Sequence, residues 1–327
     1  MALPPPFSAG HVPSFVPNTF FNDSLKQLAD IKGMSDLNVM LVDLTKQPKR
    51  PVGFGATGVY NGSRTRYIVS IGKVAAMYAA FRLRKNFREA AREARARNAN
   101  ELVAEITKEW KPLVQRTISG VADFPELKTI FTINGNQGGW DIQFTDTYYK
   151  RMQGMIGPSH NSDASHCILA LGYQYIQGAL AADGFYKAGE GGLWLTGDYA
   201  KGRDGPVEPT SRSHQVSNVG ALAKMLVAAA NQGLVKDSAS SQMRRMMNNA
   251  FMFRILRDKP SRPVSATSFG KLGIGSDGTY HDAAVIERTT EKGTKIRYAA
   301  IILGSKGYTP LWRAGRFLDD IVVAQHE

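Results

Sequence analysis

A serine and a lysine stand one helical turn apart at Ser70 and Lys73, where an alternating apolar stretch runs into a strongly amphipathic one. A neutral lysine on the same helix face can take the proton of a serine hydroxyl, which makes the hydroxyl nucleophilic without a histidine. The spacing alone is weak evidence, because it arises about once by chance in a chain of this length. It recurs at Ser268 and Lys271, where glycines follow instead of a helix.

Two further groups of polar residues follow Ser70 in the chain. Ser159-His160-Asn161 is the only S-x-N sequence, and it precedes an apolar helical segment. Lys271-Leu272-Gly273 begins a stretch that alternates like a strand. Each has a plain structural interpretation, since serine and asparagine cap helices and a lysine can be an ordinary strand residue. Their order and their placement on the expected elements favour a shared site.

The order S-x-x-K, S-x-N, K-x-G resembles the signature of serine β-lactamases and penicillin-binding proteins. Residues 67–74 are similar to the nucleophile helix of class A β-lactamases and related DD-peptidases. Residues 159–172 resemble their S-D-N segment, and residues 271–286 resemble the strand-turn-strand that carries their K-T-G. The likeness extends over about residues 35–80 and 155–325, and the block from about 84 to 150 is longer than usual for the family.

The resemblance implies a role for each matched residue. Ser70 would be the nucleophile, Lys73 its base, and Ser159 a relay that passes a proton to the leaving group. Four residues of the two later segments would bind the substrate: Asn161, Lys271, Gly273 and Ile274. The backbone N–H groups of Ser70 and Ile274 would form the oxyanion hole. Lys73 and Lys271 would lower each other's pKa, because two nearby cations disfavour the charged forms.

Two positions depart from the family pattern. Leu272 stands where the family has a threonine or serine, which removes a hydroxyl that helps to hold a β-lactam carboxylate. In the glycine-rich loop, Glu190-Gly-Gly-Leu193-Trp194 resembles the E-x-x-L-N loop, with tryptophan in place of the asparagine. Glu190 is therefore a candidate base for deacylation, and the plain alternative is a solvated loop carboxylate.

The remaining pattern predicts an α+β fold of the β-lactamase/transpeptidase type. Strands are expected near both ends of the chain, over residues 37–44, 51–60, 269–276, 280–290 and 295–305. Helices are expected between and after them, over residues 70–81, 82–98, 101–113, 146–155, 166–182, 216–230, 240–257 and 311–325. The simplest packing is one antiparallel sheet flanked by helices, with an all-helical second lobe.

This packing divides the chain into four parts. We expect an N-terminal arm over residues 1–35, extended or disordered in its first twenty residues. An α/β lobe would combine residues 36–82 and 255–327, and a helical lobe would cover 83–254. Within that lobe, the basic stretch 82–98 is expected to be a solvated helix, and 118–141 to be rich in loops. The long loop at 185–209 is a candidate active-site loop.

Composition limits the other function classes. The net charge of +13 permits an acidic partner, but no zinc-finger, RNP or basic-zipper signature supports nucleic-acid binding. The single cysteine, Cys167, excludes an internal disulfide and is expected to be a core thiol. No histidine has metal-ligand spacing, so neither metal nor cofactor is expected. No apolar run is long enough to span a bilayer.

The sequence does not decide the cellular compartment of the protein. The first fifteen residues do not read as a signal peptide, so a cytoplasmic protein is one expectation. The family resemblance implies a periplasmic or secreted protein if the chain has been trimmed.

Two functions remain. The leading hypothesis is a serine hydrolase that works through an acyl-enzyme at Ser70, on a small amide, lactam or ester that bears a carboxylate. It covers β-lactamase-like and DD-peptidase- or esterase-like enzymes. The alternative is a weak or inactive protein of the same fold that serves as a ligand- or partner-binding module.

Overall fold

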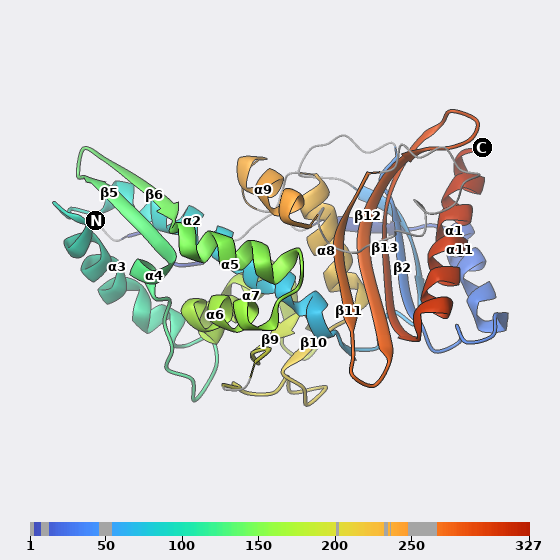
Figure 1. Ribbon diagram of the computed structural model, residues 1–327, viewed down its shortest axis with the longest axis horizontal. Helices are drawn as coiled ribbons and strands as arrows, with labels where there is room; N and C mark the ends of the chain where they lie inside the picture. The colour runs from blue at the N-terminus through green and yellow to red at the C-terminus, as the bar shows by residue number, and fades with distance from the viewer. Residues whose placement is uncertain are drawn as a thin grey trace.

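A computed structural model describes residues 3–7, 13–45, 54–200, 203–231, 235, 237–247 and 267–327. The predicted helix 240–257 is described only as far as residue 247, and the expected boundary between residues 254 and 255 lies outside the described residues. Figure 1 shows an elongated molecule with a large sheet in one half and most of the helices in the other.

The large sheet joins strands from the two ends of the chain. Its order is β1-β3-β2-β13-β12-β11, and its strands are β1 (Ser14–Pro17), β2 (Asn38–Asp43), β3 (Phe54–Tyr60), β11 (Thr267–Ile274), β12 (Thr279–Thr289) and β13 (Lys295–Lys306). All neighbouring pairs are antiparallel except β1 and β3, which are parallel. The predicted antiparallel sheet is therefore confirmed, with one parallel strand added at its edge.

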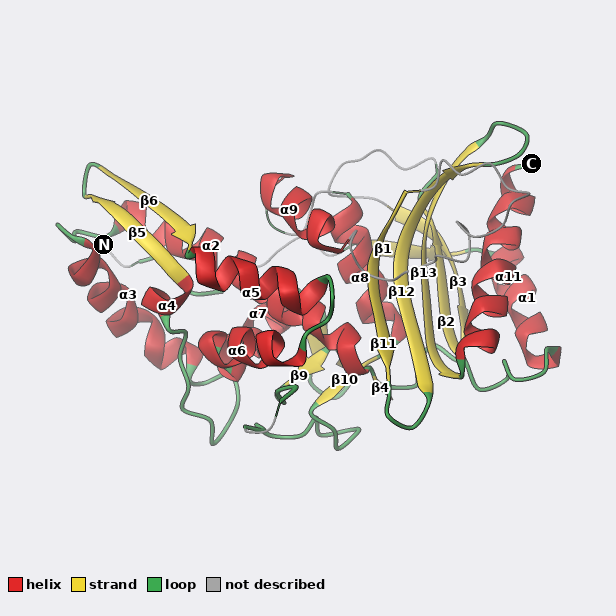
Figure 2. Ribbon diagram, in the orientation of Figure 1, coloured by secondary structure: helices red, strands yellow, loops and turns green. Residues whose placement is uncertain are grey.

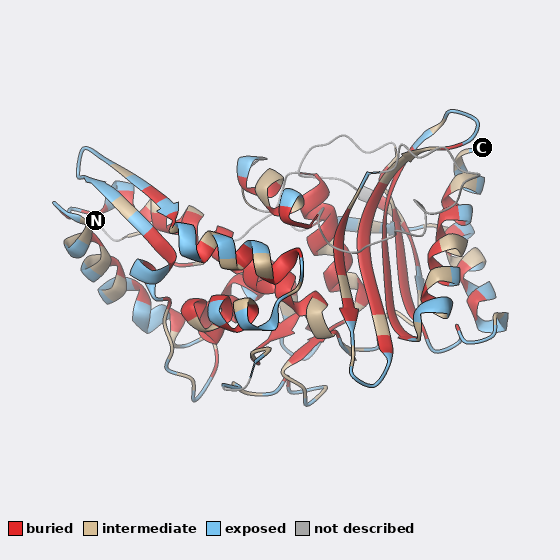
Figure 3. Cartoon of the chain, in the orientation of Figure 1, coloured by how far each residue is buried: buried red, intermediate tan, exposed pale blue. Residues whose placement is uncertain are grey.

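Helices cover both faces of this sheet. Figure 2 shows α1 (Thr19–Lys26) and α11 (Tyr308–His326) beside the sheet at the far end of the molecule, with α8 (Val219–Ala230) and α9 (Asp237–Met247) on the other side. Side chains alternate along a strand, so Ala284 and Ile286 pack with Leu318 of α11. Ala283 and Val285 instead join the core that continues into the helical half. The central strands and α8 are accordingly buried along most of their length (Figure 3).

The helical half is built around one long helix, α2 (Lys73–Glu93). The helices that pack against it are α3 (Ala99–Val114), α5 (Asp146–Ile156), α6 (Asn161–Leu171) and α7 (Tyr173–Ala182), and strands β5 (Phe131–Asn136) and β6 (Gly139–Phe144) contact it as well. The short helix α4 (Leu127–Ile130) packs on α6 and β5. The strands form a hairpin, which corrects the loop-rich prediction for 118–141. The predicted helix 166–182 is two helices, because Gly172 at φ +76° breaks the helical path.

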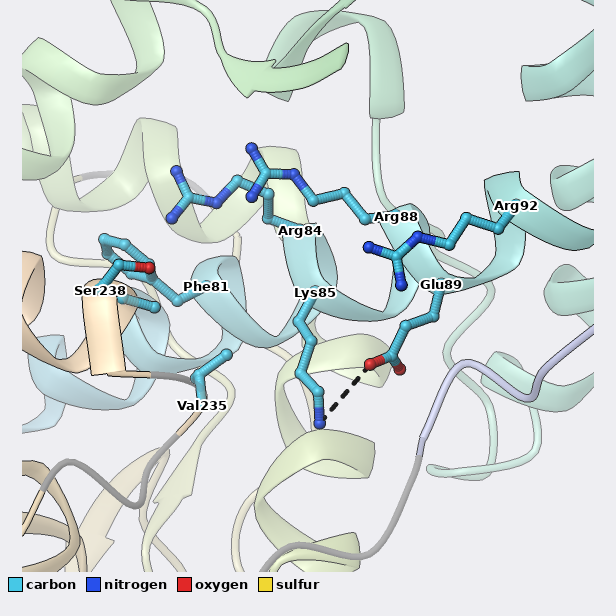
Figure 4. Close-up of a pocket in the computed structure, with 9 residues that line it drawn as sticks. Phe81, Arg84, Lys85, Arg88, Glu89, Arg92, Val235 and Ser238 are labelled. Atoms are coloured by element: carbon cyan, nitrogen blue, oxygen red, sulfur yellow. Dashed lines mark ion pairs between the residues drawn. The ribbon is translucent and has the colours of Figure 1, made fainter. Parts of the chain in front are cut away.

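The basic stretch after residue 82 is the clearest correction. Its first part is the interior of α2, and Arg82 and Arg84 are both buried. Arg82 Nε lies 3.0 Å from the buried carboxylate of Asp183. The Arg84 guanidinium lies 4.4 Å from the ring centre of Phe144, so its charge is placed against an aromatic face. Figure 4 shows Arg84, Arg88 and Arg92 of this stretch beside a small cavity next to α9. A charge run alone could not reveal these buried partners.

The described part of the N-terminal 35 residues is built into the fold rather than extended from it. Phe7 packs against Tyr175 of the helical half, with ring centroids 5.3 Å apart. Further along, β1 pairs with β3, and α1 packs against the sheet. The segment therefore contacts both halves of the molecule.

Short elements connect the two halves. The predicted loop 185–209 contains β7 (Tyr186–Lys187), β8 (Gly191–Gly192) and β9 (Trp194–Leu195), and β9 joins a small sheet with β10 (Gln215–Ser217) and β4 (Arg66–Tyr67). Two 3-10 turns, η1 (Gln27–Asp30) and η2 (Val69–Gly72), complete the described elements. None of the described helices is long and apolar enough to cross a membrane.

Candidate active site

Ser70 lies in η2, the short turn that leads from β4 into α2. The turn is held from two directions. Ile68 N–H donates to Gln215 O at 3.1 Å, and Tyr199 OH donates to Val69 O at 2.7 Å. Val69 has φ +49°, a conformation that a β-branched residue rarely adopts. The Tyr199 contact therefore supports a strained residue directly before the serine.

Lys73 is fully buried at the start of α2, and its Nζ reaches across to the loop before α6. It donates to Ser159 O at 2.7 Å, to Ser159 Oγ at 3.1 Å and to Asn161 Oδ1 at 2.8 Å. Ser159 takes φ +66° at this point, and Asn161 is the first residue of α6. These contacts join Lys73 to Ser159 and Asn161, and none of them goes to Ser70 Oγ.

Lys271 approaches Ser159 from the opposite side. It lies on β11, the edge strand of the large sheet, and its Nζ donates to Ser159 Oγ at 2.9 Å. Two residues on, Gly273 passes close to η2: a Cβ at this position would lie 2.8 Å from Ile68 O. Glycine is therefore needed here to bring the strand against the turn that carries Ser70.

Burial lowers the pKa of both lysines, and like charge acts in addition on Lys73. Burial, and next the charge of Lys271, lowers the pKa of Lys73 to about 7. Burial also lowers the pKa of Lys271 to about 8, although the nearby Asp282 carboxyl opposes this shift. A large share of Lys73 is thus neutral near neutral pH, which is the form that can accept a proton.

A cavity of about 460 Å³ opens beside these groups. It is lined by Ser70, Gly157, Pro158, Ser159, Lys271, Leu272, Ile274, Tyr280 and Tyr308. The structure therefore brings Ser70, Ser159, Lys271 and Ile274 together around one cavity. Lys73 and Asn161 are hydrogen-bonded to each other beside Ser159, and Gly273 lies against η2. In the described part of the chain, no cluster of histidine, cysteine and carboxylate side chains has the proximity needed to hold a metal ion.

Glu190 lies apart from this group. Its side chain is 66% exposed at the turn between β7 and β8, and its carboxylate is paired with Lys187 Nζ. It does not line the cavity. The structure thus places it as a solvated loop carboxylate, the alternative to a role in deacylation.

Tyr199 is the site residue that the sequence pattern did not reveal. The Lys73 ammonium lies 4.6 Å from the centre of its ring. Burial raises the pKa of Tyr199 well above its usual value, so the phenol stays neutral and keeps its hydrogen bond to Val69. A tyrosine in a glycine-rich loop without periodicity carries no signal that could have identified it.

The remaining sequence candidates have structural roles. His160 is exposed, and its Nδ1 lies 3.1 Å from Asp163 Oδ2. Cys167 is fully buried, and burial raises the pKa of its thiol to about 12, as expected of a core cysteine.

Solved structures define the class of fold. A class A β-lactamase from Mycobacterium abscessus aligns with 91% of this chain and 97% of its own, at 15% identity and a TM-score of 0.54. A β-lactamase from Burkholderia phymatum aligns with 93% of this chain and 100% of its own, at 14% identity and a TM-score of 0.53. A third structure is a variant of the class A β-lactamase of the last common ancestor of Gram-negative bacteria, bound to a nitrobenzotriazole transition-state analogue. It aligns with 94% of this chain and 98% of its own, at 16% identity and a TM-score of 0.52.

The chain therefore has the fold of the class A β-lactamases, as the resemblance to the serine β-lactamase and penicillin-binding superfamily led us to expect. No family model matches the chain. The search of curated proteins found no match either.

Proposed function

We propose that the protein is a serine hydrolase that forms an acyl-enzyme at Ser70. The observation that carries the proposal is the position of Ser159 Oγ, which lies 3.1 Å from Lys73 Nζ and 2.9 Å from Lys271 Nζ beside the cavity that Ser70 lines. Two buried lysines with lowered pKa values around one hydroxyl are costly to maintain unless they serve a purpose. Proton transfer is such a purpose.

In the proposed reaction, Ser70 Oγ attacks the carbonyl carbon of an amide, lactam or ester. Neutral Lys73 takes the hydroxyl proton, and the electron pair of the C=O bond moves to oxygen, where the Ser70 and Ile274 N–H groups stabilise it. When the C=O bond re-forms, the bond to the leaving nitrogen or oxygen breaks. The leaving atom receives a proton through Ser159, and the acyl group remains on Ser70. Water then hydrolyses this ester.

The two halves of the reaction have unequal support. The described contacts of Lys73 are a carbonyl, a hydroxyl, an amide oxygen and the Tyr199 ring, and none is a carboxylate. With Glu190 exposed and paired with Lys187, a carboxylate base for the deacylating water is missing from these contacts. We therefore propose a long-lived acyl-enzyme, closer to penicillin-binding behaviour than to rapid lactam turnover.

The test is covalent labelling followed by intact-protein mass spectrometry. The protein would be incubated with a fluorescent penicillin and, separately, with a fluorophosphonate. We expect one adduct per chain that is lost in Ser70→Ala and retained in Ser63→Ala, a change at an exposed turn serine. No adduct with either reagent would contradict the proposal and favour the non-catalytic binding module.

A further inference from the structure

The cavity beside Ser70 has two chemically different sides, because β11 presents alternate residues to its two faces. Lys271 points toward Ser159. Leu272, on the other face, packs against the core between the sheet and α11, as does Tyr280. Ile274 and Tyr280 are cross-strand partners, so the three apolar or aromatic side chains share one face.

Tyr308, at the start of α11, extends this surface. Its ring centre lies 6.4 Å from that of Tyr280 in an edge-to-face arrangement. Tyr308 is 52% exposed and Ile274 is 51% exposed, which makes both unusually open for large hydrophobic side chains. Leu272, Ile274, Tyr280 and Tyr308, which we call the apolar wall, thus offer uncovered apolar surface next to the nucleophile.

Positive charge is confined to the other side of the cavity. Among the described residues that line it, Lys271 is the only cation, and its ammonium is hydrogen-bonded to Ser159 Oγ and Leu272 O. Arg66 and Lys306 line a separate cavity. Arg66 donates to Asn38 Oδ1 and Asp36 O, and Lys306 Nζ lies 3.8 Å from Asp277. None of the four described residues that form the apolar wall carries a charge, so a carboxylate placed against them would lose water without gaining a cation from the wall.

We propose that the apolar wall is a binding subsite for an uncharged aromatic or alkyl group of the substrate. This proposal rests on the proposed acyl-enzyme at Ser70. It assigns the substrate class as esters or amides that carry no charge beside the scissile carbonyl. It replaces the carboxylate-bearing substrate that the sequence led us to expect.

The direct test compares one fluorescent penicillin as the free acid and as its methyl ester, two reagents that differ at the carboxyl group alone: the acid is charged there, and the ester is neutral and carries a methyl group. For the natural chain we expect the methyl ester to acylate Ser70 at least as fast as the acid. Leu272→Thr, which supplies a hydroxyl for the carboxylate, should shift the ratio toward the acid by about tenfold. Both rates come from the same protein sample, so a lowered folded fraction does not affect the ratio.

A variant of the wall gives a second readout. Tyr308→Ser should slow acylation by the methyl ester about five- to tenfold and leave the acid rate within about twofold, because only the neutral group uses the wall. Phe20→Ser, which changes a 42% exposed aromatic residue at the start of α1, is the matched control and should alter neither rate.

The outcomes separate the inference from the function beneath it. Acylation of the natural chain by the acid about tenfold faster than by the methyl ester, or no labelling by the methyl ester, would overturn the subsite. If the fluorophosphonate still labels Ser70 in that case, the proposed hydrolase survives. If neither the penicillins nor the fluorophosphonate labels Ser70, the proposed function fails first and the subsite fails with it.

Discussion

The residues that face Lys73 come from two regions that contribute differently. The loop before α6 supplies the Ser159 hydroxyl, and the start of α6 supplies the Asn161 amide; both accept from Lys73 Nζ. Strand β11 supplies the Lys271 ammonium, which donates to the same Ser159 hydroxyl. The loop 185–209 supplies the ring of Tyr199, while its carboxylate at Glu190 points to solvent. The groups that the proposed attack would use are thus joined in one hydrogen-bond network, and the carboxylate expected to assist release lies outside it. The comparison teaches that, in the proposed reaction, attack and release would depend on different regions of the molecule.

The largest effect is expected from removing the proposed base. Lys73→Met keeps much of the side-chain volume but cannot accept a proton, so fluorophosphonate labelling of Ser70 should slow by about a hundredfold or more. Lys108→Met, at an exposed position on α3, should label at the normal rate. Equal rates for both variants would remove Lys73 from the chemistry and with it the contrast between the two regions.

The pH dependence sharpens the same point. Lys73 acts only when neutral and its pKa is lowered to about 7, so the labelling rate should be low in acid and rise through about pH 7 to a plateau. Lys271→Met removes a neighbouring cation that lowers this pKa, so the midpoint should move to higher pH. The measurement is the second-order labelling constant between pH 5 and 9. A rate that falls as pH rises would contradict the assignment.

A smaller effect is expected from the Tyr199 hydroxyl. Tyr199→Phe removes the hydrogen bond to Val69 O and leaves that carbonyl without its donor, which costs about 1–3 kcal/mol. The lost hydrogen bond destabilises the strained backbone of Val69 beside Ser70, so labelling of Ser70 should slow by about tenfold. The pH at which the labelling rate is half-maximal should not change. A shift of the midpoint with no loss of rate would show that Tyr199 acts on Lys73 instead.

The smallest effect is expected at Glu190. Its carboxylate is exposed and paired with Lys187, so Glu190→Gln should change the lifetime of the acyl-enzyme by less than about twofold. The lifetime is read from the decay of the adduct mass after excess reagent is removed. A lifetime that lengthens by about tenfold or more would restore Glu190 as the deacylating base and break the comparison.

Regular elements explain why much of the molecule was predictable. The short apolar runs in β12 and β13 and the apolar start of α2 led to the correct fold. The order of Ser70, Ser159 and Lys271 led to the residues that the fold brings together. Tyr199 escaped prediction because its position depends on a loop whose path is set by tertiary contacts. The buried Arg82 was misread for a related reason, since its partner Asp183 lies far away in the sequence.

The central claim is our proposal that Ser70 forms an acyl-enzyme and that no carboxylate among the described contacts of Lys73 is there to release it quickly. A pulse of a fluorescent penicillin, given in separate samples as the free acid and as its methyl ester and followed by intact-protein mass spectrometry over time, tests both parts together. The account predicts one adduct on Ser70 that persists long after free reagent is removed. An adduct that never forms, or one that forms and disappears within a few turnovers while free product accumulates, would contradict it.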